Sequence, residues 1–118
     1  MPASHHIALR WLEAFNAHNM EDLLALYDDA AVHYSPKLKI LHPETEGLIR
    51  GKAALRSWWQ DAFDRLPSLQ YHPTTITADD SRVFMEYTRQ VSDEQDMPVA
   101  EVLDIRSGLI IASRVYHG

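Results

Sequence analysis

The sequence predicts a single α+β domain, in which three helices from its first half pack on one face of a mostly antiparallel sheet. Apolar residues recur at helical spacing as far as residue 66. Beyond that point they alternate with polar residues in runs separated by turn residues, as strands do. The length of 118 residues is that of one domain with one core, so we expect a single domain over residues 1–118.

Three helices are expected in the first half. Ser4 is a good N-cap, and apolar residues at helical spacing follow it, which predicts a helix from about 5 to 18. Asn19 precedes a second, short helix that should end near residues 28–29. The third helix should span 51–66, because Pro67 stops it.

Between the second and third helices the pattern is weaker. Residues 31–35 predict a short strand with Tyr34 on one side and His33 on the other. Residues 36–50 contain two prolines, a glycine and few periodic signals, so we expect a long loop with at most one turn. Loops of this length inside a compact domain are often lids or binding edges.

The second half predicts four strands. The first covers about 69–78, and Pro73 confines it to a sheet edge or a bulge. The second covers 82–92. The last two, 99–105 and 109–117, form a hairpin that turns at Gly108.

The length of the hairpin loop decides which side chains share a face. A two-residue loop would put Arg114 opposite Glu101 and spread polar groups over both faces. A three-residue loop pairs Ile105 with Leu109 and makes one face mainly apolar, so we expect this register. The inner face would then carry Glu101, Leu103, Ile105, Leu109, Ile111, Ser113, Val115 and His117, and the outer face Val102, Asp104, Ile110, Ala112, Arg114 and Tyr116.

Composition argues against several classes of function. The net charge of −6 and the scattered Lys and Arg residues argue against nucleic-acid binding and against binding to an anionic membrane. No cysteine is present, which rules out disulfides and thiol chemistry. No apolar run is long enough for a membrane span and the first residues lack a signal-peptide pattern, so a cytoplasmic protein is expected. The histidines lack ligand-like spacing and no phosphate-binding loop is visible, so we expect neither metal nor cofactor.

Four segments carry a family resemblance: WLEAFNAHN (11–19), LYDDAAV (26–32), GKAALRSWW (51–59) and EVLDIRSGLI (101–110). They and the order of elements resemble the nuclear transport factor 2-like superfamily, and within it the SnoaL-like proteins. The resemblance implies a curved sheet wrapped around the helices as a cone with a largely apolar pocket. The superfamily includes ketosteroid isomerases, epoxide hydrolases, polyketide cyclases and dehydratases, together with non-catalytic binding modules, so fold alone does not decide function.

The site of the ketosteroid isomerases can be carried over position by position. It has a tyrosine donor on the first helix, an aspartate base after the first strand and a protonated aspartate opposite them. The matching positions here are Trp11, Tyr34 or Ser35, and Glu101. Only the acid at Glu101 is retained, so the resemblance does not imply this particular isomerase reaction.

Glu101 is the leading candidate for chemistry, because a carboxyl group facing the pocket would have a raised pKa suited to acid–base work. Its alternative role is an ordinary strand carboxylate paired with an arginine. His117 or Tyr34 would assist it, although a histidine so near the chain end is often only a frayed residue. The remaining side chains expected to line a closed pocket are Trp11, Phe15, Trp59, Phe63, Met85, Tyr87, Leu103, Ser113 and Val115.

These observations predict a protein that holds a small apolar molecule. It would be a cofactor-free acid–base enzyme of cyclase, isomerase, dehydratase or hydrolase type using Glu101, or else a non-catalytic binding or dimerisation module of the same fold. The outer face is too apolar for a solvated sheet, so a homodimer through Val102, Ile110, Ala112 and Tyr116 is expected.

Overall fold

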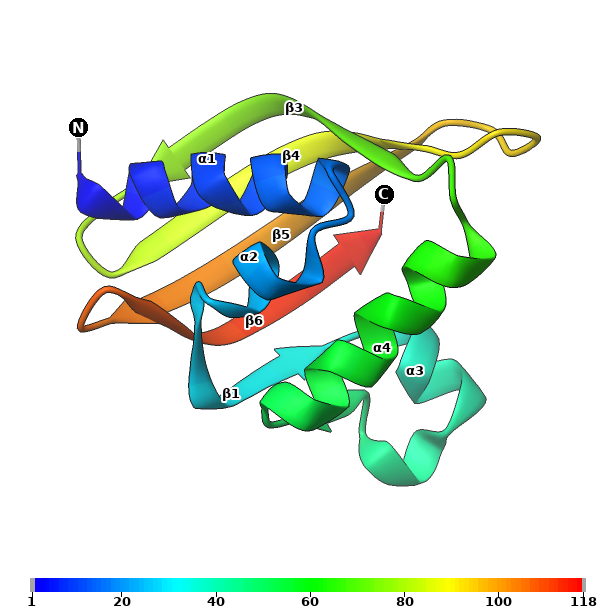
Figure 1. Ribbon diagram of the computed structural model, residues 1–118, viewed down its shortest axis with the longest axis horizontal. Coiled ribbons are helices and arrows are strands. Elements are labelled where there is room, and N and C mark those ends of the chain that lie inside the picture. The colour runs from blue at the N-terminus through cyan, green and yellow to red at the C-terminus, as the bar shows by residue number, and fades with distance from the viewer. Residues whose placement is uncertain (1, 118) are drawn as a thin grey trace.

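The computed structural model describes residues 2–117, which form a curved six-stranded mixed sheet with the helices gathered on one face (Figure 1). The helices are α1 (Ala3–Asn16), α2 (Met20–Leu24), α3 (Pro36–Leu41) and α4 (Lys52–Arg65), with a short 3-10 helix η1 (Pro43–Thr45). The strands are β1 (Tyr27–Tyr34), β2 (Leu48–Arg50), β3 (Gln70–Ala78), β4 (Arg82–Gln90), β5 (Met97–Arg106) and β6 (Leu109–His117). The predicted α+β class is therefore confirmed.

The two long helices follow their apolar spacing. The buried residues of α1 are spaced along one face, and those of α4 include Leu55, Trp59 and Phe63. Asn19 caps α2 as predicted, since its side chain accepts a hydrogen bond from the backbone N–H of Asp22. The helix ends earlier than predicted, at Leu24, because the chain enters β1 at Tyr27. No helix among residues 2–117 is long and apolar enough to span a membrane.

The segment between β1 and α4 is more ordered than predicted. Instead of a long loop it contains α3, η1 and β2. Ser35 caps α3 and Pro36 occupies its first turn, which are favourable positions for both residues. None of the α3 residues is buried, so no apolar periodicity marks this helix in the sequence.

The strand order is β2-β1-β6-β5-β4-β3, and only the β1–β6 pair is parallel. This pair joins the first strand of the chain to the last, with His33 opposite Ser113. At the other edge, β3 changes register between Pro73 and Thr75, which confirms the predicted edge strand or bulge.

The final hairpin has a shorter loop than predicted. Arg106 pairs with Leu109, so the turn contains two residues, Ser107 and Gly108, both with positive φ as in the favoured two-residue turns. The register then shifts by one residue beyond Ile110. Because this bulge restores the predicted alternation, Ser113 still lies on the same face as Glu101, but Glu101 is opposite Val115 rather than Ser113.

The prediction that Ile110 lies on the outer face of the sheet is wrong. Ile110 is fully buried in the core, and its backbone N–H donates to the carbonyl of Leu26. It therefore faces the helices and does not contribute to the outer apolar surface.

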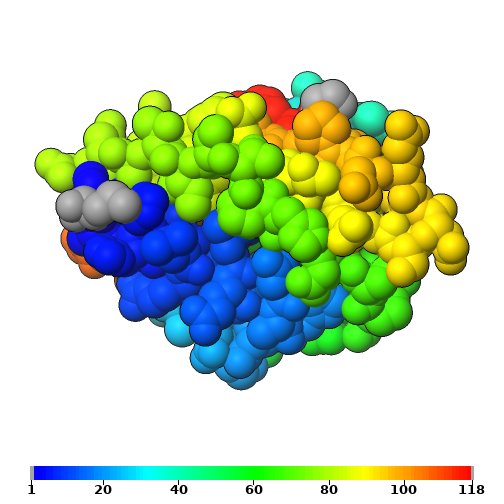
Figure 2. Space-filling model, turned by 90° about the horizontal axis from the view of Figure 1, so that it is seen from above, coloured from blue at the N-terminus to red at the C-terminus, as the bar shows by residue number. Residues whose placement is uncertain are grey.

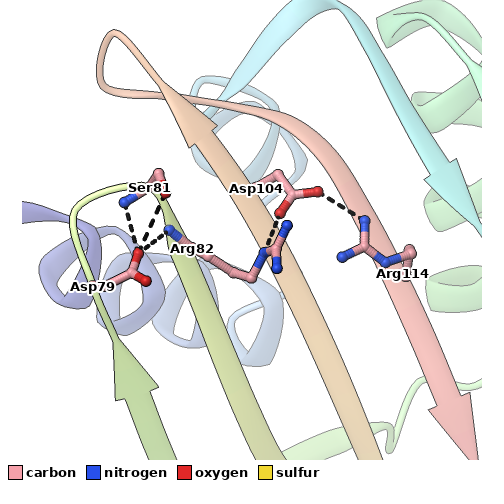
Figure 3. A network of polar contacts seen from close by, with 5 residues as sticks. All are labelled: Asp79, Ser81, Arg82, Asp104 and Arg114. Atoms are coloured by element: carbon pink, nitrogen blue, oxygen red, sulfur yellow. Dashed lines mark hydrogen bonds and ion pairs between the residues drawn. The ribbon is translucent and has the colours of Figure 1, made fainter.

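The outer face of the sheet carries an ionic network across three strands (Figure 3). Asp104 on β5 accepts hydrogen bonds from Arg82 on β4 and Arg114 on β6, both at 2.7 Å. Partial burial alone would raise the pKa of Asp104, but the hydrogen bonds from Arg114 and Arg82 lower it. Phe84 and Tyr116 lie on the same outer face and are 41% and 48% exposed.

Candidate active site

A cavity of about 650 Å³ lies between the inner face of the sheet and helices α1, α3 and α4. Its deep walls include Trp11 and Phe15 from α1 and Trp59 from α4. The cavity is open at one end rather than closed as predicted. Ile40 and Leu41 of α3 show this, since they line the cavity and are 80% and 63% exposed. The turn between β4 and β5 borders this mouth, and Figure 2 shows that turn projecting at one end of the molecule.

Glu101 lies at the base of the cavity, in the middle of β5. Its side chain is 2% exposed, and its Oε1 accepts a hydrogen bond of 2.9 Å from the Tyr87 hydroxyl on β4. Its Oε2 is buried without a hydrogen-bond partner among residues 2–117. Burial raises the pKa of Glu101 to about 8, against the smaller opposing effect of the Tyr87 hydrogen bond. The carboxyl group is therefore mostly protonated at neutral pH.

His33 is the group that stands beside this acid. Its Nδ1 lies 2.6 Å from the Ser113 hydroxyl and 3.9 Å from Oε2 of Glu101. Although that distance would suit an ion pair, burial lowers the pKa of His33 to about 4. Both members of the pair are thus neutral at pH 7: the carboxyl group carries a proton, and the imidazole can accept one.

The three polar side chains do not form a nucleophilic triad. Such a triad needs the serine on one imidazole nitrogen and the acid on the other, whereas Ser113 and Glu101 both approach Nδ1 of His33. Ser113 is also fully buried and does not line the cavity. The arrangement suits proton donation by Glu101 and proton acceptance by His33.

Aromatic stacking supports the acid from one side. Tyr71 lies between Phe15 and Tyr87, with ring centroids 4.0 and 4.1 Å away. Burial raises the pKa of Tyr87, so its hydroxyl stays protonated and keeps donating to Glu101. The histidine of the pair has an aromatic neighbour of its own, since the Trp59 ring packs against His33 with the ring centroids 5.8 Å apart.

The cavity wall contains five of the predicted lining residues: Trp11, Phe15, Trp59, Tyr87 and Val115. The other four, Phe63, Met85, Leu103 and Ser113, are buried in the adjacent core and do not line it. Within residues 2–117, no group of three or more His, Asp or Glu side chains is placed to hold a metal ion.

The two predicted assistants of Glu101 lie away from it. Tyr34 is outside the cavity wall, and its ring packs against Gly47, because neighbouring strand residues face opposite sides and His33 faces inward. His117 lines the mouth and is exposed. It pairs with Val99, two residues from Glu101 along β5, so the strand rise separates their levels by about 7 Å. The predicted register would have made this about 13 Å.

The neutral pair predicts how stability depends on pH. The ordinary pKa of histidine is 6.5, so about one pH unit above it His33 is almost entirely neutral in both the folded and the unfolded chain and contributes little slope. Glu101 has an ordinary pKa of 4.5 when unfolded and about 8 when folded, so the folded state binds more protons between these values. The free energy of unfolding should therefore fall as pH rises from about 7.5 to 8.5, by at most about 1.4 kcal/mol per pH unit.

Urea unfolding at several pH values in this window checks the sign. Glu101→Gln should remove the fall, whereas Glu13→Gln, at an exposed position on α1, should keep it. Equal slopes for the wild type and Glu101→Gln would contradict a protonated Glu101.

Comparisons with known proteins place this geometry in a family. The family model described as "SnoaL-like domain" matches residues 8–113. A SnoaL-like protein of unknown function from Burkholderia thailandensis has a TM-score of 0.86 and 20% identity, over 98% of this chain and 95% of that one. No curated protein matches the sequence.

Two further solved structures share the fold. A proposed ketosteroid isomerase from Kribbella flavida has a TM-score of 0.81 and 18% identity, over 98% of this chain and 78% of that one. A proposed polyketide cyclase from Sinorhizobium meliloti has a TM-score of 0.79 and 14% identity, over 98% of this chain and 100% of that one. At these identities the likeness shows the fold alone, but the family match covers most of the sequence: the chain belongs to the SnoaL-like family.

Proposed function

We propose that the cavity binds a small, largely apolar molecule and catalyses a cofactor-free acid–base step on it. The observation that carries this proposal is the pair of neutral titratable groups at the cavity base, with His33 Nδ1 3.9 Å from Glu101 Oε2. A binding module would need only an apolar cavity. Burying two such groups side by side is costly and gives a binding module no evident advantage.

Each residue has a distinct role in the proposed step. Glu101 donates the proton on its unpartnered Oε2 to a carbonyl or hydroxyl oxygen of the substrate, while Tyr87 holds Oε1. His33 accepts a proton from the substrate or from a water molecule. The resulting carboxylate and imidazolium lie close enough to stabilise each other until the protons return.

Several reactions share this step. Isomerisation, cyclisation and dehydration all move one proton to an oxygen or carbon and another away from carbon. The proposed activities of two structural neighbours, a ketosteroid isomerase and a polyketide cyclase, are of this type and support the proposal. In this chain the base is His33 rather than a residue at position 34 or 35, where the family resemblance placed it.

Glu101→Gln tests the catalytic role, because it keeps the shape of the side chain and removes the proton. Cyclic ketones and hydroxyketones would be screened by NMR in D₂O for protein-dependent exchange or conversion. With a substrate so identified, Glu101→Gln should abolish turnover and leave affinity within about tenfold. His33→Asn should also abolish turnover, whereas His117→Gln at the mouth should lower it less. Wild-type turnover by Glu101→Gln would overturn the catalytic role of Glu101, and the absence of any protein-dependent conversion would leave the non-catalytic binding module as the function.

We also propose that the chain forms a homodimer through the outer sheet face. Phe84 and Tyr116 are exposed there, next to Val102, and the Arg82–Asp104–Arg114 network would border the contact. These apolar side chains on one sheet face favour a self-complementary contact.

Sedimentation velocity at micromolar concentration checks the dimer. The wild type should sediment as a dimer and Phe84→Glu as a monomer, because a charge at the centre of the contact would be desolvated. Leu9→Glu, at a comparably exposed position on α1, should leave the dimer intact. A monomeric wild type would decide against the proposal.

A further inference from the structure

The mouth of the cavity is more cationic than the rest of the molecule. The whole chain carries a net charge of −6, yet the charged side chains around the mouth are Lys37, Arg65 and Arg89 against Asp61 and Glu94. Two of these cations are neutralised, since Arg65 pairs with Asp61 and Arg89 with Glu94, each at 2.8 Å. Lys37 forms no ion pair among the residues described by the structure.

Three of the basic groups converge from different elements. Arg89 lies on β4 on the same face as Tyr87, His117 ends β6, and Lys37 is in α3, which also lines the cavity. Lys37, Arg89 and His117 all line the same cavity, and the pKa of His117 is lowered by burial and then by the charges of Arg89 and Lys37. The Arg89 side chain is only 15% exposed, and only one of its guanidinium nitrogens donates to Glu94.

The apolar part of the cavity begins directly below this rim. His117 pairs with Val99, and Val115 pairs with Glu101, so one strand repeat of about 7 Å separates the rim from the buried acid. A molecule that reaches Glu101 would thus be enclosed by aromatic walls at one end and meet basic side chains at the other.

We propose that the ligand of this cavity is a small organic acid, whose apolar body reaches Glu101 and whose anionic group is held at the rim by Lys37, Arg89 and His117. This inference rests on the proposed function and adds the chemical class of the ligand. Glu94 competes with the anion for Arg89, so its exposed carboxylate would be displaced or weaken binding.

Two fluorescent probes with the same aromatic skeleton separate the apolar from the anionic contribution: anilinonaphthalene sulfonate and the neutral N-phenyl-1-naphthylamine. The sulfonate should bind the wild type more tightly, and its affinity should fall with added salt, whereas that of the neutral probe should not. Lys37→Gln should weaken the sulfonate about fivefold, as the loss of one partly exposed charge contact does, and leave the neutral probe unchanged. Glu94→Gln should strengthen only the sulfonate.

Lys39→Gln is the matched control, because Lys39 is exposed on the same helix but does not line the cavity. It should change neither affinity. If the neutral probe binds and the sulfonate binds no better, or if Lys37→Gln and Lys39→Gln act equally, the anionic rim is wrong while the apolar cavity stands. If neither probe binds, the proposed ligand-binding function fails together with the inference.

Discussion

The burial of the Glu101 carboxyl group is the constraint on which the candidate site depends. An ionised carboxylate in this position would lose its hydration and gain only one hydrogen bond, from Tyr87. The group therefore keeps its proton, and its pKa rises to about 8. The same burial lowers the pKa of His33 to about 4, so one environment produces a proton donor and a proton acceptor side by side.

The fold holds this pair by joining elements distant in the sequence. The acid comes from β5, and the histidine comes from β1 through its parallel pairing with β6, which also supplies Ser113. Stacked rings of α1, β3 and β4 keep the Tyr87 hydroxyl aimed at Glu101. The cavity that contains the pair is open where the exposed residues Ile40 and Leu41 of α3 line it.

The sequence was sufficient for the elements that bury a periodic apolar face, and for the inward position of Glu101. It was not sufficient for His33, because alternation separates the two sides of a strand without saying which side is buried. That choice depends on a non-local pairing with Ser113. The hairpin register was predicted wrongly for a related reason. A bulge beyond Ile110 leaves the predicted alternation of later residues unchanged, so no pattern in the sequence reveals the bulge. Helix α3 was not predicted because none of its residues is buried, so no apolar periodicity marks it in the sequence.

The central claim is that Glu101 is a protonated acid at neutral pH, and side-chain carboxyl ¹³C NMR tests it most directly. In protein labelled at the glutamate carboxyl carbons, one resonance should titrate near pH 8 and be missing from Glu101→Gln. Hydrogen bonds from Arg56 and Arg89 lower the pKa values of Glu21 and Glu94, so the resonances of these two side chains should titrate in a lower pH range. If every glutamate resonance titrated in that lower range, Glu101 would be a carboxylate at pH 7 and the acid–base account of the site would be contradicted.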